Sequence, residues 1–217
     1  MVIPAYNESQ AIAGLISGIR RQGLEVVVVD DGSGDDTLRL AKDSQATVLH
    51  NQKTQGKGAA LIKGFSYALS NNFDAVVTMD GDGQHDPDDL PCFLSRAESS
   101  KSAIFIGNRM WELKNMPWLR SLTNRFMSWM ISKISRQKIA DTQCGFRLIK
   151  RELLEKLRLR TAKYETESEM IIQAARLGFK IESLPIKTIY QGEKSQIHPL
   201  MDTCRFIRLI LRELLWT

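Results

Sequence analysis

The chain has 217 residues, of which 43% are hydrophobic and 25% are charged, a composition that is ordinary for a globular protein with one complete core. Three widely spaced cysteines without a C-x-x-C pair indicate neither a disulfide framework nor a zinc cluster. No apolar run approaches the ~18 residues of a membrane span and no charged segment precedes an apolar leader, so we expect neither a secreted nor a membrane-spanning protein.

Charge is unevenly distributed along the chain, whose formal net charge is +5. Residues 1–100 hold 8 Lys and Arg against 14 Asp and Glu, whereas residues 101–217 hold 22 against 11. The segment 109–163 alone has 14 basic and 4 acidic residues. Such a positive field suits anionic lipid or phosphate. Because no known nucleic-acid-binding motif accompanies the charge, we expect no nucleic-acid partner.

Short apolar strands alternate with helical segments through the first half of the chain. Residues 2–8 resemble the end of a first strand that turns into a helix, with Asn7 or Ser9 as its cap. Further strands are predicted over 25–30, 46–50, 75–80 and 103–108, and a helix over 60–69. This alternation predicts an α/β fold whose mostly parallel central sheet has helices on both faces.

Ligands of such sheets collect at the carboxyl ends of the strands. Polar residues stand at these ends in this chain, namely Tyr6-Asn7-Glu8, Asp30-Asp31, Asp80-Gly81-Asp82 and Gly107-Asn108-Arg109. The sequence therefore predicts a binding site at this edge of the sheet.

The stretch 76–89, VVTMDGDGQHDPDD, carries the most specific chemical signal. Gly81 and Gly83 allow the chain to bend, which would bring Asp80 and Asp82 together as ligands of one divalent cation. Mg²⁺ characteristically takes one or two protein carboxylates and completes its shell with phosphate oxygens and water. The alternative is an acidic turn that leads into a helix opened by Asp86-Pro87.

After Arg109 the alternation stops. A helix is predicted over 118–135, with large apolar side chains on one face and a basic fringe, a pattern that suits either an anionic membrane surface or packing on the core. A helix over 166–177 ends at Gly178, a strand follows over 180–190, and a last amphipathic helix covers 201–216.

Seven motifs in order and spacing resemble family 2 glycosyltransferases, most closely the dolichyl-phosphate mannosyltransferase-like branch that loads sugars onto polyprenyl phosphate. They are PAYNE, DDGSGDDT, GKGAA, MDGDGQHDP, GNR, DTQCGFR and ESEM, followed by LPI, and they extend from Pro4 to about Pro199. The resemblance implies a nucleotide-diphosphosugar transferase fold of the GT-A type. It implies one domain over 1–217, with a nucleotide-sugar and metal-binding half over 1–108 and an acceptor-binding half with amphipathic helices over 109–217.

The resemblance also assigns roles to single residues. The nucleotide-sugar pocket would be lined by Pro4, Tyr6, Glu8 and Asp31, with Lys57 as a cation near the donor. Asp80, Asp82 and Gln84 match the D-x-D-x-Q positions that hold a divalent metal, Mg²⁺ or Mn²⁺, and the diphosphate. Arg109 and Arg147 match basic positions associated with the acceptor phosphate, where a guanidinium fork is geometrically suited, and Arg120 is a third. Arg147 could instead form a structural pair with Asp141 or Glu152.

The expected reaction is metal-dependent transfer of one sugar from a UDP- or GDP-sugar to a polyprenyl phosphate, with inversion, at the cytoplasmic face of a membrane that the protein contacts peripherally. If the acceptor were instead a hydroxyl group of a glycan, a protein or a small molecule, a carboxylate base would be needed. Glu169 is then the first candidate and Glu167 the second. A fold that binds nucleotide-sugar without catalysis is a third hypothesis. The stretch 190–195, YQGEKS, departs from the branch pattern of Arg before G-x-S-K, which leaves mannosyl transfer and the acceptor loop open.

Overall fold

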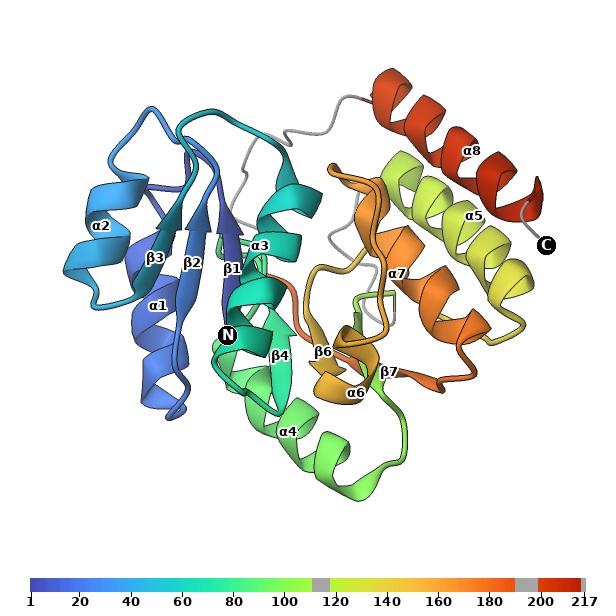
Figure 1. Cartoon of the computed structure of the whole chain (residues 1–217), viewed down its shortest axis with the longest axis horizontal. Helices are drawn as coiled ribbons and strands as arrows, with labels where there is room; N and C mark the ends of the chain where they lie inside the picture. Colours follow the sequence, from blue (N-terminus) through green and yellow to red (C-terminus); the bar gives the residue numbers. More distant parts are fainter. Residues whose placement is uncertain (111–117, 190–198, 216–217) are drawn as a thin grey trace.

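The computed structural model describes residues 1–110, 118–189 and 199–215. In this part of the chain one seven-stranded sheet has the order β3-β2-β1-β4-β6-β5-β7. Its strands are β1 (Val2–Ala5), β2 (Val27–Asp30), β3 (Thr47–His50), β4 (Ala75–Thr78), β5 (Ile104–Asn108), β6 (Arg147–Lys150) and β7 (Ile181–Pro185). Neighbouring strands are parallel except where β6 pairs with β4 and with β5 (Figure 1).

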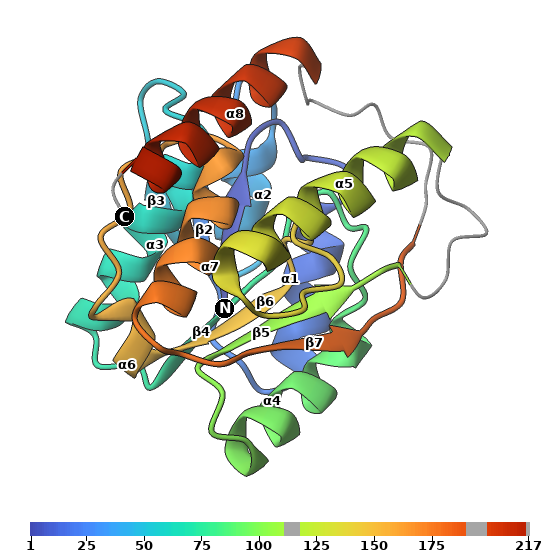
Figure 2. The ribbon, with the colours of Figure 1, turned by 90° about the vertical axis from the view of Figure 1, so that its right-hand side faces the viewer.

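Helices cover both faces of the sheet. They are α1 (Ile12–Arg21), α2 (Thr37–Asp43), α3 (Lys57–Ser70), α4 (Leu90–Ser99), α5 (Trp118–Ser135), α6 (Arg151–Leu154), α7 (Glu165–Arg176) and α8 (Pro199–Leu215), with a short 3₁₀ helix, η1 (Pro87–Asp89), before α4. Figure 2 shows α7 on one side of the strands and α1 and α4 on the other. Helices α3 and α7 contact each other, and α1 contacts η1. The predicted layering is therefore confirmed.

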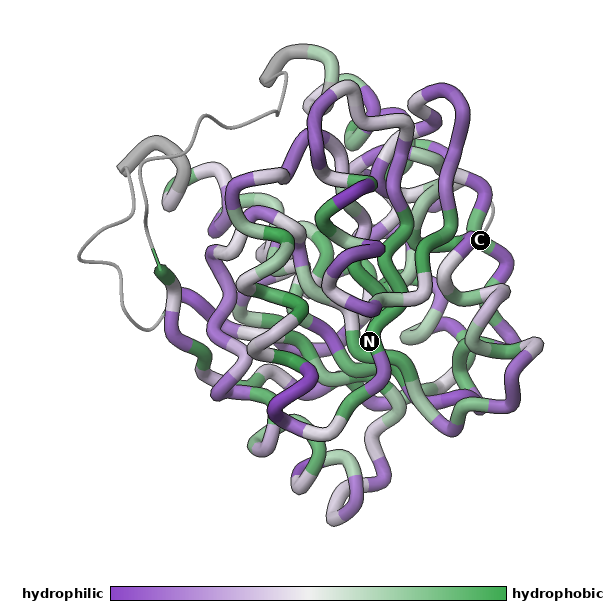
Figure 3. Tube along the Cα trace, turned by 90° about the vertical axis from the view of Figure 1, so that its left-hand side faces the viewer, coloured by the Kyte–Doolittle hydropathy of each residue, from purple (hydrophilic) through white to green (hydrophobic). Residues whose placement is uncertain are grey.

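The core lies between the sheet and these helices. Three valines of β2, Val27 to Val29, are at most 5% exposed, and every residue of β1 is buried. Continuous apolar strands of this kind are expected where a parallel sheet is covered on both faces. In Figure 3 the strands are green where they pass through the interior, while much of the outer trace is purple or pale.

Strand β6 was not predicted, although it lies inside the sheet between β4 and β5. It has only four residues, Arg147–Lys150, and α6 follows it without a linking turn. Its register is antiparallel to both neighbours, with Thr78 opposite Arg147 on one side and Ile106 opposite the same residue on the other. The strand predicted over 180–190 is shorter than expected and ends at Pro185; residue 190 lies outside the described residues.

The predicted cap of the first helix was wrong. Helix α1 begins after Ala11, which makes no side-chain capping hydrogen bond. Asn7 has a positive φ of 57°, and its Oδ1 accepts a hydrogen bond from the Gly34 backbone N–H. The Ser9 backbone N–H in turn donates to Asp35 Oδ2. Both residues therefore join the loop after β1 to the loop after β2.

Helices α5 and α8 form a further layer outside α7, which both of them contact (Figure 1). Helix α5 turns both polar and apolar side chains inward, since Asn124, Ser128 and Ile131 are 7%, 4% and 0% exposed. Its apolar residues Leu122, Phe126 and Trp129 are 57–59% exposed, and the rings of Phe126 and Trp129 are 6.2 Å apart. The side chains of residues 118–120, including Arg120, lie outside the described residues.

The exposed apolar face of α5 has a basic fringe, because Arg125, Lys133 and Arg136 are exposed beside it. Helix α8 also exposes apolar residues, namely Met201, Ile207 and Leu211. No helix in the described residues is long and apolar enough to cross a membrane.

Candidate active site

Polar residues from both halves of the chain meet at one edge of the sheet. Strands β1, β2, β4 and β5 end at this edge because they are parallel, and β6 begins there because it runs in the opposite direction. The predicted site residues near these strand ends are Pro4, Tyr6, Glu8, Asp31, Asp80, Asp82, Gln84, Arg109 and Arg147. The sheet therefore brings most of the predicted site residues to one edge.

The loop after β4 turns sharply at its glycines. Gly83 has a φ of +72°, a conformation that glycine adopts without strain, and the Gln84 backbone N–H donates to Asp82 Oδ1 at 3.0 Å. A Cβ added to Gly81 would lie 3.2 Å from Glu8 Cγ. The loop after β4 is therefore packed against the loop after β1, and Glu8 comes close to the two aspartates.

Lys57, at the start of α3, reaches into this loop. Its Nζ lies 2.6 Å from Asp80 Oδ1 and 3.1 Å from Glu167 Oε2, and its side chain is only 16% exposed. Glu167 lies in the first turn of α7, in the second half of the chain. Lys57 thus links the D-x-D loop to α7, and Glu167, the second candidate for a base by its position in the sequence, joins the site as an ion-pair partner of Lys57.

The electrostatics of Asp80 and Asp82 differ because Lys57 and His85 outweigh burial at Asp80 but not at Asp82. Burial alone would raise the pKa of Asp80, but Lys57 and His85 outweigh burial and hold this pKa well below its usual range. Burial and the charge of Asp80 raise the pKa of Asp82 above its usual range. The two carboxylates therefore repel each other, and a cation shared between them would relieve that repulsion.

The residues present fit a divalent cation. Asp80 Oδ1 is buried, and in the described structure it has an ion-pair partner but no hydrogen bond of good geometry. No cluster of three or more His, Cys, Asp or Glu residues arranged to hold a metal occurs within 1–110, 118–189 and 199–215. Two carboxylates leave most coordination positions of an ion free, and Mg²⁺ and related ions fill these positions with substrate phosphates and water.

His85 lies directly behind the two aspartates. It is 2% exposed, its Nε2 lies 3.7 Å from Asp80 Oδ2, and its ring meets Phe146 edge-on at 5.7 Å. Its Nδ1 is buried without a hydrogen-bond partner among the described residues. His85 therefore supports Asp80 from the protein interior.

The carboxylate of Asp31 is fixed by hydrogen bonds from neighbouring protein groups. Its carboxylate accepts hydrogen bonds from Asn51 Nδ2, Thr54 Oγ1 and the backbone N–H groups of Gln55 and Gly56. Burial would raise the pKa of Asp31, but these hydrogen bonds outweigh it and lower the pKa below its usual range. Asp31 thus shapes the loop that leads into α3, and a direct bond to a nucleotide base stays a prediction.

Arg109 and Arg147 are both buried and bonded to protein acceptors. Arg109 is 6% exposed and pairs with Asp141 through Nε at 2.7 Å and a second guanidinium nitrogen at 3.1 Å. Arg147 is 1% exposed and donates to the backbone carbonyls of Cys144, Glu167 and Thr142. Arg147 therefore has the structural surroundings of the alternative, but its carboxylate neighbour is Glu167, at 3.8 Å, in place of Asp141 or Glu152.

Glu169 lies two residues after Glu167 in α7, and its side chain is 1% exposed. The carboxylate accepts hydrogen bonds from the Arg160 and Thr161 backbone N–H groups, from the Thr161 hydroxyl and from Gln173 and Arg212. These donors come from the segment before α7, from α7 itself and from α8. The structure thus gives Glu169 the surroundings of an anchor between these elements, and its role as a base is untested.

Two glycines allow the halves of the chain to approach closely. A Cβ on Gly145 would overlap the carboxylate of Asp80, and a Cβ on Gly58 would overlap the Thr166 side chain. The Thr78 hydroxyl also donates to the Gly145 carbonyl at 2.7 Å. The segment before β6 is therefore packed tightly against the loop after β4. The neighbouring Cys144 is an unreactive thiol, because burial raises its pKa to about 12.

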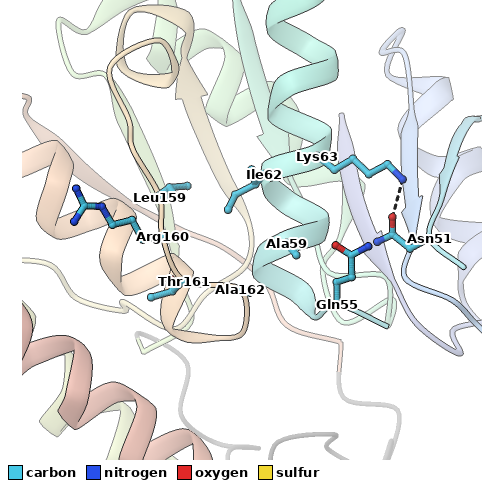
Figure 4. Close-up of a pocket in the computed structure, with 9 residues that line it drawn as sticks. All are labelled: Asn51, Gln55, Ala59, Ile62, Lys63, Leu159, Arg160, Thr161 and Ala162. Carbon is cyan, nitrogen blue, oxygen red and sulfur yellow. Dashed lines mark hydrogen bonds between the residues drawn. The ribbon is translucent and has the colours of Figure 1, made fainter. Parts of the chain in front are cut away.

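A pocket of about 480 Å³ lies beside the start of α3 (Figure 4). Figure 4 shows its lining residues, which are Asn51, Gln55, Ala59, Ile62, Lys63, Leu159, Arg160, Thr161 and Ala162. Asn51 and Gln55 are also hydrogen-bond partners of Asp31. The pocket therefore adjoins the predicted nucleotide side of the site, whereas Asp80 and Asp82 do not line it.

Known proteins share both the sequence pattern and the fold. The family model described as Glycosyl transferase family 2 matches residues 1–158. A UDP-N-acetylglucosamine–dolichyl-phosphate N-acetylglucosaminyltransferase from Methanococcus voltae is 30% identical over 213 residues, which cover 88% of this chain and 85% of that protein. An undecaprenyl-phosphate mannosyltransferase from Micrococcus luteus is 31% identical over 202 residues, which cover 85% of this chain and 81% of that protein.

Among solved structures, glucosyl-3-phosphoglycerate synthase from Mycobacterium tuberculosis, in complex with Mn²⁺, UDP and glucosyl-3-phosphoglycerate, superposes with a TM-score of 0.75. The match covers 99% of this chain and 77% of that one at 22% sequence identity. At this identity the likeness bears on the fold alone.

Proposed function

The chain belongs to glycosyl transferase family 2, and from this premise we propose that it moves one sugar from a UDP- or GDP-sugar to a polyprenyl phosphate. The predicted GT-A-like α/β fold and the prediction of a hexosyltransferase are confirmed. We propose four further features of this function, which are the donor, the metal, the acceptor and the membrane contact.

The single observation that carries the proposal is the meeting of Asp80, Asp82 and Lys57 at the carboxyl edge of the sheet. Asp80 and Asp82 would hold Mg²⁺ or Mn²⁺, with Gln84 beside them, and the ion would act as a Lewis acid on the leaving diphosphate. Lys57 provides a second positive charge at the same place. Pro4, near the end of β1, and Tyr6, Glu8 and Asp31, in the loops after β1 and β2, would enclose the nucleotide.

The acceptor is proposed from the names of the relatives and from the basic second half of the chain. Two relatives at 30% and 31% identity are named for transfer to dolichyl phosphate and undecaprenyl phosphate. A phosphate monoester has a second pKa of about 6 and is largely ionised near neutrality, so it attacks without a protein base. The Glu169 carboxylate, which is surrounded by donors, gives no support to the alternative with a hydroxyl acceptor.

In the proposed reaction, an oxygen of the acceptor phosphate forms a bond to the anomeric carbon of the sugar. The bond from that carbon to the donor diphosphate breaks, and the nucleoside diphosphate leaves with the electron pair. Lys57 would oppose the charge that develops on the leaving group. Contact between the acceptor phosphate and Arg109 or Arg147 stays a prediction, and at Arg109 the phosphate would have to compete with Asp141.

Peripheral contact with the cytoplasmic face of a membrane is proposed through α5, with α8 beside it. Helix α5 packs on the core through Ile131, so Phe126 and Trp129, which point outward, form an apolar face that core packing does not use. Apolar residues with a basic fringe are typical of helices that lie on anionic lipid. A lipid-linked phosphate would be reached from such a position.

The test is transfer of label from radiolabelled UDP- and GDP-sugars into organic-extractable lipid, with polyprenyl phosphate in vesicles and Mn²⁺ or Mg²⁺ present. We expect labelled lipid with one donor class, and its loss in Asp82→Ala. Asp43→Ala is the matched control, since Asp43 is an exposed aspartate on α2 whose carboxylate pairs with Arg39.

Label that stays in the aqueous phase would contradict the lipid acceptor. If the same protein then labels a soluble hydroxyl compound, the acceptor assignment changes while the family assignment stands. If it binds the donor by calorimetry and transfers to no acceptor, the binding-module hypothesis replaces the enzyme.

A further inference from the structure

A single buried cation joins carboxylates from the two halves of the chain. Lys57 Nζ lies 2.6 Å from Asp80 Oδ1 and 3.1 Å from Glu167 Oε2, although Lys57 and Glu167 are 110 positions apart. The side chains of Lys57 and Glu167 are 16% and 7% exposed. Water therefore screens these charges weakly, and the position of Nζ determines which carboxylate is neutralised.

Asp80 Oδ1 cannot keep this partner when a metal binds to it. Mg²⁺ binds carboxylate oxygens at about 2.1 Å. An ammonium group 2.6 Å from the same oxygen would lie beside the ion and would repel it strongly in a partly buried site. Binding of a divalent cation to Asp80 Oδ1 thus requires Nζ to move away.

Glu167 is the nearest place to which Nζ can move. Glu167 Oε2 already accepts a hydrogen bond from Nζ. The backbone carbonyl of Glu167 is itself fixed by Arg147, and the Arg147 guanidinium lies 3.8 Å from Glu167 Oε1. Because Gly58 and Thr166 are in close contact, the starts of α3 and α7 cannot approach further. A shift of Nζ from Asp80 towards Glu167 would therefore be a movement of the Lys57 side chain alone.

We propose that Lys57 is an exchangeable counter-ion of Asp80, and that Glu167 is the positioning residue that receives Lys57 when a divalent cation binds. This inference rests on the metal site of the proposed function and extends it to α7. In the metal-free protein Lys57 neutralises Asp80. In the metal-bound protein it neutralises Glu167, so arrival of the metal changes the charge balance at the first turn of α7.

The test measures Mn²⁺ affinity by calorimetry and by the paramagnetic resonance of free Mn²⁺, with and without UDP and without any acceptor. Removing the competing cation in Lys57→Met should tighten Mn²⁺ binding by about tenfold, a usual size for coupling between two sites. Glu167→Gln should weaken Mn²⁺ binding, because Lys57 then has only Asp80 as a partner. In the Lys57→Met background, Glu167→Gln should have little further effect.

Two matched variants separate this exchange from a general effect of charge. Lys42→Met removes an exposed lysine of α2 that does not line the pocket, and it should leave Mn²⁺ affinity unchanged. Glu165→Gln removes a carboxylate two residues before Glu167 and should also leave it unchanged. Thermal unfolding of each variant checks the fold, and the isosteric Glu167→Gln tests the proposal even if Lys57→Met does not fold.

Equal Mn²⁺ affinities in wild type and Lys57→Met, or an equal effect of Glu167→Gln in both backgrounds, would overturn the exchange. If lipid labelling persists in that case, the proposed function stands without it. Absence of Mn²⁺ binding in both proteins, even with UDP present, would overturn the exchange together with the metal site.

Discussion

Gly145 lies so close to Asp80 that any side chain at position 145 would overlap the Asp80 carboxylate. Gly145 belongs to the segment before β6, whereas Asp80 follows β4, and the Thr78 hydroxyl holds the two segments together through the Gly145 carbonyl. The position of Asp80, a predicted metal ligand, thus depends on Gly145, which lies 65 positions further along the chain.

Gly145→Ala should therefore displace Asp80 without unfolding the protein. We expect Mn²⁺ binding to weaken and sugar transfer to fall by about a hundredfold, the usual cost of a small misplacement at a reacting centre. Calorimetry and the labelling assay measure the two effects. Gly14→Ala is the matched control, because a Cβ at Gly14 has no neighbour within 4 Å, and it should leave both quantities unchanged.

Arg147→Lys should mainly reduce stability. The guanidinium of Arg147 donates to three backbone carbonyls in the interior, and a lysine cannot reach all of them. We expect the free energy of unfolding in urea to fall by about 2 to 4 kcal/mol, while Arg39→Lys on the surface of α2 changes it by less than about 0.5 kcal/mol. Unchanged stability with loss of polyprenyl-phosphate binding would instead favour a direct contact with the acceptor.

Glu169→Gln distinguishes an anchor from a catalytic base. The neutral amide keeps the shape of Glu169 but places an NH₂ group among donors, so the free energy of unfolding should fall by about 2 kcal/mol. Transfer per folded molecule should stay within a few-fold of wild type. The opposite result, full stability with no transfer at any pH, would restore the hydroxyl-acceptor hypothesis.

The double variant Phe126→Ser/Trp129→Ser should lose binding to vesicles that contain anionic lipid. Both side chains are more than half exposed, so the midpoint of thermal unfolding should hardly change. Co-sedimentation with vesicles measures binding, and Leu177→Ser, which removes an exposed apolar residue beyond the end of α7, is the control. Undiminished sedimentation of the double variant would exclude α5 as the membrane contact.

Glu182 should make stability depend on pH in the acidic range. Burial alone would raise its pKa, but hydrogen bonds from Ser100, Ser102 and Arg96 outweigh burial and lower the pKa from 4.5 to about 2. Because folding favours the ionised carboxylate, this contribution is complete above about pH 4.5, the unfolded value, and disappears as the pH falls through about 2.

Glu182→Gln should accordingly be less stable than wild type at neutral pH, and the difference should shrink as the pH falls below 4.5. Urea unfolding at a series of pH values measures it. Glu155→Gln is the control, because Glu155 is half-exposed and forms a salt bridge with Arg151. Its stability should differ less from wild type at neutral pH than that of Glu182→Gln. A constant difference between pH 7 and pH 3 would contradict the assignment.

The first half of the fold could be predicted because its signals are local. The valines before Asp30 and the apolar run before Asp80 each contain their own evidence for a buried strand. Strand β6 gave no such evidence. Its four residues form a strand because they pair with β4, which ends at Thr78, and with β5, which begins at Ile104. Short central strands depend on tertiary pairing, which no window of sequence contains.

The candidate site divides in the same way. The motif around Asp80 and Asp82 indicated two carboxylates at a strand end, and the structure places them there. The contact of Lys57 with Glu167 spans 110 positions and could not be read from spacing. The pairing of Arg109 with Asp141 and the bonding of Arg147 to carbonyls likewise arise only when β6 enters the sheet.

The reversed strand β6 also has a consequence for synthesis on the ribosome. When residue 108 has left the exit tunnel, β4 and β5 are both available, yet they are not neighbours in the finished sheet, because β6 lies between them. Until residue 150 appears, β4 therefore presents an unpaired edge, the kind of surface that associates with other chains. The nascent chain would be most vulnerable to aggregation in this interval. Pairing of β6 ends the interval, and the same step brings Gly145 against Asp80.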